Sequence, residues 1–159
     1  MLLRALLVDD EDHNLNILQF MLQNDCEDVE IAGIAKNAQQ ARDWLKENKA
    51  DVVFLDINMP GENGFQFLAS LPRHEFKIVF VTAHNEFALQ AIKASAVDYI
   101  LKPVNIAELQ RAVEKVKLLV ASPAAASQNR QLVEHLLQVI SKKAPPKKIA
   151  LPQLGGINF

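Results

Sequence analysis

The sequence is poor in cysteine, in long apolar runs and in net charge. Its single cysteine, Cys26, cannot form an internal disulfide, which fits a reducing compartment. No apolar run is long enough to cross a bilayer, and the acidic residues 9–12 cut the apolar start of the chain too short for a signal peptide. A net charge of −2 gives no support to nucleic-acid binding by the chain as a whole. We therefore expect a soluble, cytoplasmic protein without membrane insertion.

What is present is the composition of a globular protein. Half of the 159 residues are hydrophobic and 23% are charged, so the chain can bury a core. Apolar runs rich in β-formers predict five strands, over residues 5–8, 29–35, 52–55, 77–81 and 98–101. Apolar residues at helical spacing predict an amphipathic helix after each strand, the second capped by Asn37 and the fifth by Asn105. This strict alternation predicts a doubly wound α/β fold whose parallel sheet has the strand order 2-1-3-4-5.

The composition changes after about residue 121. Small residues predominate over 121–127, and we interpret 122–146 as a linker. Within the linker, an apolar stripe from Leu132 to Ile140 predicts a short amphipathic helix. Such a helix is too brief to be stable alone and must dock on something, with a second copy of itself, in a homodimer, as one alternative. We interpret residues 147–159 as the severed start of a further domain.

Polar residues follow four of the predicted strands at the carboxyl edge of the sheet. Asp9 and Asp10 follow the first strand, Asp56 the third, Thr82 the fourth and Lys102 the fifth. Ligands of open α/β sheets bind at this edge, beside the switch point between strands one and three. Taken singly, these residues have simpler interpretations as a helix cap, a turn residue, a strand-end hydroxyl and a solvated charge. Their joint occurrence at one edge favours a functional site.

The chemistry of such a site follows from its charges. Three neighbouring carboxylates repel one another, and a divalent cation relieves that repulsion. Mg²⁺ fits best, because it takes carboxylate and carbonyl oxygens while keeping waters and meeting a phosphate. A metal beside an ammonium and a hydroxyl group is suited to phosphoryl transfer. Asp56 is the candidate nucleophile, forming an acyl phosphate, because the neighbouring acids can hold the metal.

Four motifs together resemble the receiver domain of two-component response regulators, over residues 1–121. They are Leu6-Leu7-Val8-Asp9-Asp10-Glu11, Leu55-Asp56-Ile57-Asn58-Met59-Pro60 with Gly64, Val81-Thr82-Ala83 and Asp98-Tyr99-Ile100-Leu101-Lys102-Pro103. The resemblance implies a flavodoxin-like fold in which Asp56 is phosphorylated by a sensor histidine kinase. It also implies that Asp10 is a direct Mg²⁺ ligand, that Asp9 holds the ion partly through water, and that Asn58 offers its backbone carbonyl.

The same resemblance implies a switch. Thr82 and Tyr99 match the switch pair, Lys102 matches the lysine that pairs with the phosphoryl group, and the bond to Pro103 is expected to be cis. On phosphorylation Thr82 would be drawn toward the phosphoryl group, and the Tyr99 ring would turn into the vacated space. The face formed by the fourth helix, the fifth strand and the fifth helix would thereby be remodelled.

The end of the chain extends the resemblance and leaves alternatives open. Residues 147–152 with Gly155 and Gly156 resemble the opening of a LytTR-type DNA-binding domain, which implies a transcription regulator, not an enzyme, that contacts DNA through an output domain mostly missing from this chain. One alternative is a Mg²⁺-dependent phosphatase working through an aspartyl phosphate, but Asn58 stands where such enzymes commonly carry a second acid. Another is a stand-alone receiver acting as a binding module, against which the residues after Pro146 argue.

Overall fold

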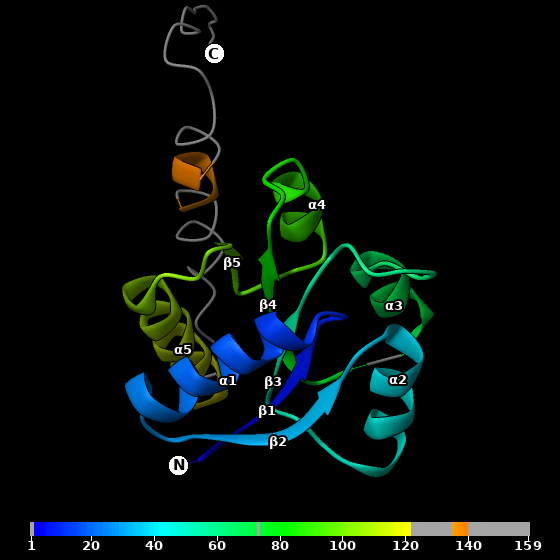
Figure 1. The fold of residues 1–159 in the computed structure, drawn as a ribbon, viewed down its shortest axis with the longest axis horizontal. Coiled ribbons are helices and arrows are strands. Elements are labelled where there is room, and N and C mark those ends of the chain that lie inside the picture. Colours follow the sequence, from blue (N-terminus) through cyan, green and yellow to red (C-terminus); the bar gives the residue numbers. More distant parts are fainter. Residues whose placement is uncertain (1, 73, 122–134, 140–159) are drawn as a thin grey trace, which may run out of the picture.

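The predicted five strands and five helices are all present. The computed structural model describes residues 2–72, 74–121 and 135–139 (Figure 1). Its elements are β1 (Leu3–Val8), α1 (Asp12–Asp25), β2 (Val29–Ala35), α2 (Ala38–Glu47), β3 (Val52–Leu55), α3 (Gly64–Ser70), β4 (Lys77–Thr82), α4 (Ala88–Lys93), β5 (Asp98–Leu101) and α5 (Ile106–Ala121). β1 begins two residues before the predicted start, because Leu3 is buried and pairs with Val29. The predictions for residues 122–134 and 140–159 lie outside the described residues.

The sheet has the predicted order, β2-β1-β3-β4-β5, and all its strand pairs are parallel. β1 pairs with β2 on one side and with β3 on the other, which makes the β1–β3 boundary the switch point. Val8 is the partner of Leu55 in this register, so the two strands end together. The residues that follow them, Asp9 and Asp56, therefore leave the sheet side by side.

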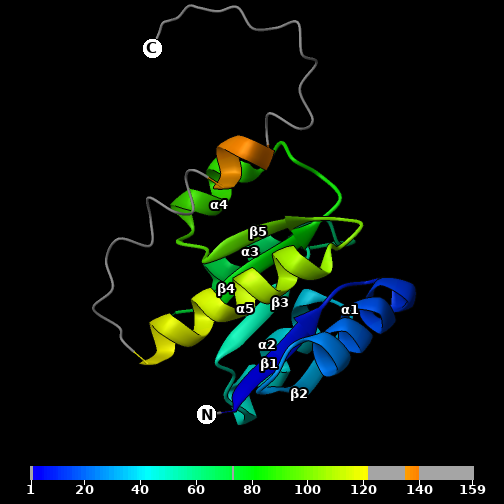
Figure 2. The same cartoon turned by 90° about the vertical axis from the view of Figure 1, so that its left-hand side faces the viewer.

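Helices cover both faces of the sheet (Figures 1 and 2). α1 and α5 bury one apolar face with alternate strand residues such as Val52 and Phe54, and α2, α3 and α4 bury the other with Val53 and Leu55. Strands buried on both faces are continuous apolar runs, which is why these segments read as strands of a parallel sheet. Asn37 caps α2 as predicted, since its side chain accepts a hydrogen bond of 2.8 Å from the amide of Gln40.

Residues 135–139 form a helical segment beside β5, the edge strand of the sheet (Figure 2). Leu136 and Val139 are 1% and 3% exposed and belong to the core cluster that contains Tyr99, whereas Leu137 is 58% exposed. Part of the predicted linker helix is therefore present, and it packs on the chain's own sheet. Within the described residues no helix is long and apolar enough to span a membrane.

Candidate functional site

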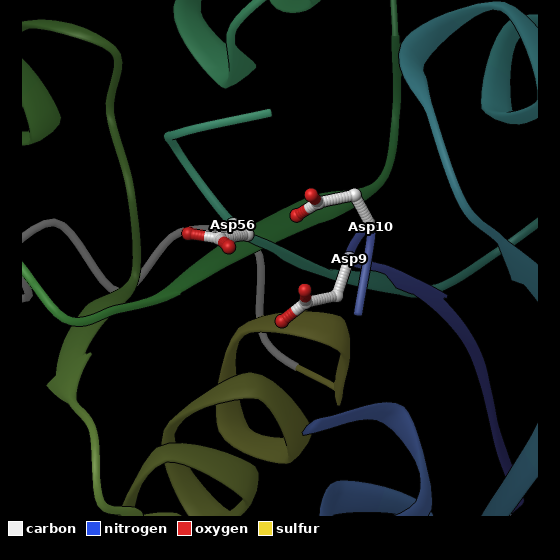
Figure 3. A group of neighbouring side chains, drawn as sticks. All are labelled: Asp9, Asp10 and Asp56. Carbon is white, nitrogen blue, oxygen red and sulfur yellow. The ribbon is translucent and has the colours of Figure 1, made fainter. Parts of the chain in front are cut away.

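Three acids meet at the carboxyl edge of the sheet. Asp9 and Asp10 extend from the end of β1 and Asp56 from the end of β3 (Figure 3). One carboxylate oxygen from each lies within 4.8 Å of the others. Asp9 and Asp56 are each 6% exposed, and Asp10 is half-buried. The structure thus brings together the three acids that the sequence placed at this edge, and their negative charges lie where little water screens them.

Lys102 is the cation that contacts these acids. It follows β5, and its backbone amide donates to the carbonyl of Thr82 across 2.8 Å, which continues the ladder between β4 and β5. Its Nζ lies 2.8 Å from Asp9 Oδ2 and 3.2 Å from Asp56 Oδ2. Burial acts to lower the pKa of Lys102, but the hydrogen bond to Asp9 and the charges of Asp56 and Asp9 raise that pKa overall. Lys102 is therefore positively charged at neutral pH. The peptide bond between Lys102 and Pro103 is cis, as expected.

The charged form of the Asp56 carboxyl is disfavoured at this position. Burial raises its pKa, the charge of Lys102 acts to lower it, and repulsion from Asp9 raises it further. The ion pair with Lys102 therefore does not fully offset the cost of burying the carboxylate beside another acid. A second positive charge at this position would favour the ionised form of Asp56, which is the form that can act as a nucleophile.

The backbone around Asp56 is fixed by two close contacts. The Asp56 amide donates to the carbonyl of Val8 across 3.0 Å, which extends the pairing of β1 and β3 by one residue. On the other side, the amide of Gly64 donates to the carbonyl of Ile57 across 2.8 Å. A Cβ at position 64 would lie 2.7 Å from the carbonyl oxygen of Asp56, so only glycine lets α3 begin this close to the site.

Thr82 and Tyr99 are joined through the main chain of His84. The His84 amide donates to Thr82 Oγ1 across 3.3 Å, and the Tyr99 hydroxyl donates to the His84 carbonyl. Both side chains are fully buried, and burial raises the pKa of Tyr99. The Tyr99 ring lies inside in this structure, and its predicted movement on phosphorylation stays a prediction. No side-chain pattern reveals a contact to a main-chain carbonyl, so the role of His84 was missed. Asn58 lies exposed in the loop after Asp56.

With this geometry established, comparison with known proteins decides the family. The family model of the response regulator receiver domain matches residues 5–114. The chain belongs to this family. Sensory transduction protein LytT of Bacillus subtilis (strain 168) is 34% identical over 138 residues, which are 86% of this chain and 57% of LytT. Transcriptional regulatory protein LytR of Staphylococcus aureus (strain N315) is 36% identical over 117 residues, 72% of this chain and 47% of LytR.

A solved structure supports the same assignment. The response regulatory domain of mrkE from Klebsiella pneumoniae superposes with a TM-score of 0.62 at 26% identity, covering 85% of this chain and 98% of that domain. The chain spans about half the length of the curated relatives it matches. Asp9, Asp10, Asp56, Thr82 and Lys102 all lie within residues 5–114, the part that the family model covers. Residues 135–139 lie beyond it, so their packing on β5 is a feature that the family match does not describe.

Proposed function

We propose that this receiver accepts a phosphoryl group on Asp56 from a sensor histidine kinase and passes the signal to an output domain. One observation carries the proposal: Asp56 is a buried carboxylate at the switch point of the sheet, with its Oδ2 3.2 Å from an ammonium and with two further acids beside it. Charge of both signs at one sheet edge is suited to holding a phosphoryl group together with a cation.

The donor set fits Mg²⁺. Three carboxylates face one lysine, so the site carries excess negative charge, and hard oxygen donors are the ligands that Mg²⁺ prefers. Asp10 would hold the ion directly, Asp9 partly through water, and Asp56 and the backbone carbonyl of Asn58 would complete the set. When bound, Mg²⁺ supplies positive charge that offsets the charge on the transferring group.

Asp56, Lys102 and Thr82 each have a separate role in the proposed phosphoryl transfer. An oxygen of Asp56 forms the new bond to phosphorus while the bond from phosphorus to the nitrogen of a phosphohistidine breaks, and the electron pair of that bond stays on the histidine. Lys102 is already beside Asp56 Oδ2 and pairs with a phosphoryl oxygen. The Thr82 hydroxyl turns from the His84 amide toward the phosphoryl group. That turn alters the main chain that Tyr99 also contacts, and so carries the change to β5.

The direct test is phosphorylation by a small acyl phosphate such as acetyl phosphate, with Mg²⁺. Wild type should become labelled with a linkage that hydroxylamine cleaves, and Asp56→Asn should lose the label. Asp43→Asn, a change at an acid on α2 whose side chain is 60% exposed, is the matched control and should label like wild type. Labelling of Asp56→Asn at the wild-type level would show that the nucleophile is elsewhere. Sustained turnover of a phosphomonoester would favour the phosphatase alternative.

We further propose that the output is transcriptional. The support is the likeness to LytR, which is named a transcriptional regulatory protein, and the resemblance of residues 147–152 to the start of a LytTR-type DNA-binding domain. A receiver with these partners would work in the cytoplasm. The protein with its output domain should shift a promoter fragment in a gel more strongly after treatment with acetyl phosphate, and an unchanged shift would contradict the proposal.

A further inference from the structure

A second cluster of buried charges lies at the start of β5, outside the phosphorylation site. Asp98 is fully buried, with its Oδ2 3.3 Å from Lys115 Nζ and its Oδ1 3.1 Å from His135 Nε2. The same Nε2 lies 3.0 Å from the carbonyl oxygen of Tyr99, and Arg111 Nη2 lies 2.8 Å from His135 Nδ1. Because a guanidinium only donates, Nδ1 accepts, and the ring proton belongs on Nε2, where the Tyr99 carbonyl and Asp98 accept it.

These contacts tie residues 135–139 to an edge strand. β5 pairs with β4 on one side only, so polar groups on its outer side need another partner. His135 supplies one to the Tyr99 carbonyl and is itself 8% exposed. A buried imidazole that bonds an edge carbonyl and a buried carboxylate is a specific anchor, because each of the groups it touches would be costly to leave unpaired.

Apolar side chains of the same segment are buried beside this polar anchor. Leu136 and Val139 share a core cluster with Ala88 and Ala91 of α4 and with the Tyr99 ring. Residues 135–139 therefore contact β5 through His135 and α5 through Arg111, and their apolar side chains share a core cluster with residues of α4. The exposed Leu137 marks the outer side of the same segment.

The length of the connection favours docking within one chain. Residues 122–134 join Ala121 to His135, and a chain of that length reaches up to roughly 45 Å. The return along α5 from Ala121 to the level of Arg111 needs only about 15 Å, at about 1.5 Å per helical residue. Because the segment is tethered by a connection that is long enough, its effective concentration at the face of its own chain is high. A second copy could compete only at a comparable protein concentration.

We propose that residues 135–139 are an intramolecular docking helix that closes the α4–β5–α5 face of the receiver and stabilises the buried position of Tyr99. Docking and ring burial favour each other, because His135 bonds the Tyr99 carbonyl and Leu136 and Val139 pack in the cluster that holds the ring. While the helix is docked, a second copy of the chain cannot use this face. The docking stands on these contacts alone, and only its link to phosphorylation rests on the proposed function.

The test follows the Tyr99 ring directly. Tyr99 is the single tyrosine of the chain, so 3-fluorotyrosine gives one ¹⁹F resonance. A soluble gadolinium chelate should relax this resonance weakly in wild type and several-fold more strongly in Leu136→Asp, which places a charge among the buried apolar side chains. Leu137→Asp adds the same charge on the exposed side of the same helix and should behave like wild type. His135→Ala should give an intermediate increase without adding any charge.

Several outcomes would overturn the docking helix. Equal relaxation in Leu136→Asp and Leu137→Asp would show that the helix does not cover the ring. Protection that falls as wild type is diluted would show that the helix comes from a second copy. Loss of the folded fluorescence of Trp44 in Leu136→Asp would mean that this variant is unfolded. The His135→Ala variant is then the test, and relaxation of its Tyr99 resonance at the wild-type level would contradict the proposal. Acetyl phosphate labelling of the wild type separates the two proposals. If the wild type is not labelled but its Tyr99 resonance is still protected from the chelate, only the proposed function of Asp56 is contradicted.

Discussion

Replacing Lys102 by methionine tests the electrostatic account of the site most directly. The change keeps a long side chain but removes the cation 2.8 Å from Asp9 and 3.2 Å from Asp56. Removing one partner of a buried ion pair costs about 3–5 kcal/mol. Because Lys102 keeps some contact with solvent, we expect the free energy of unfolding at pH 8 to fall by about 2–3 kcal/mol.

The pH dependence of that loss is the sharper part of the prediction. The pKa of Lys102 is raised in the folded state, so its stabilising charge is present at all pH values below its ordinary range and is lost only in strong alkali. Without Lys102, the pKa of Asp56 should rise further, and protons can then neutralise the acids. The loss in Lys102→Met should therefore shrink as the pH falls from 8 toward 5. Mg²⁺ at a hundred times its Kd should stabilise the variant by about 2.7 kcal/mol, which is about the size of the whole loss.

Urea unfolding followed by the fluorescence of Trp44, the single tryptophan, measures these changes. Lys46→Met is the matched control, since Lys46 is a 69% exposed lysine that pairs with Asp43 at 3.7 Å, and its loss should cost less than about 0.5 kcal/mol. If Lys102→Met loses no more than the control, or loses the same amount at every pH, then Lys102 does not neutralise the acids and the reasoning fails.

Three further changes test other parts of the structure. Asp56→Asn should raise the free energy of unfolding by about 1 kcal/mol at pH 8, because the pKa of Asp56 is raised in the folded state and its ionised form therefore opposes folding. The gain should vanish below pH ~4, where the carboxyl is protonated in both states. No gain at pH 8 would contradict this account. Gly64→Ala should lower stability by about 1–3 kcal/mol and slow acyl phosphate labelling, because its Cβ would meet the Asp56 carbonyl; unchanged values would show that α3 can move away. Asn37→Ala should cost about 1 kcal/mol in urea unfolding without affecting labelling, and an effect on labelling would count against a purely local cap.

The sequence predicted the sheet and its acid edge because both depend on local patterns. Runs such as Val52–Leu55 are apolar at every position and rich in β-formers, as a strand buried on both faces requires. Alternation with helices then fixes a parallel sheet, and a parallel sheet brings all its carboxyl ends to one edge. The meeting of Asp9 and Asp56 follows from this topology without any knowledge of side-chain packing.

The contacts that the sequence did not predict depend on packing between distant segments. The apolar stripe around Leu136 indicated a helix that needs a surface, but many surfaces satisfy an apolar stripe, and nothing local selects β5. His135 and its partner Asp98 are 37 positions apart in the sequence, and a histidine in an apolar stripe does not indicate its partner.

The arrangement along β5 connects the candidate site to the proposed docking helix. Four residues of strand and the lysine that follows carry three separate contacts: Asp98 holds His135, Tyr99 reaches the His84 carbonyl, and Lys102 holds the acids. Under the proposed function, Lys102 would exchange part of its bonding to Asp9 and Asp56 for a bond to the phosphoryl group, and we expect the end of β5, which carries this lysine, to respond. Because the Tyr99 carbonyl on the same short strand is bonded to the docking helix, that movement meets resistance from the helix. A receiver with a free β5 edge would meet no such resistance, so if both proposals hold, residues 135–139 set part of the energy that phosphorylation has to supply.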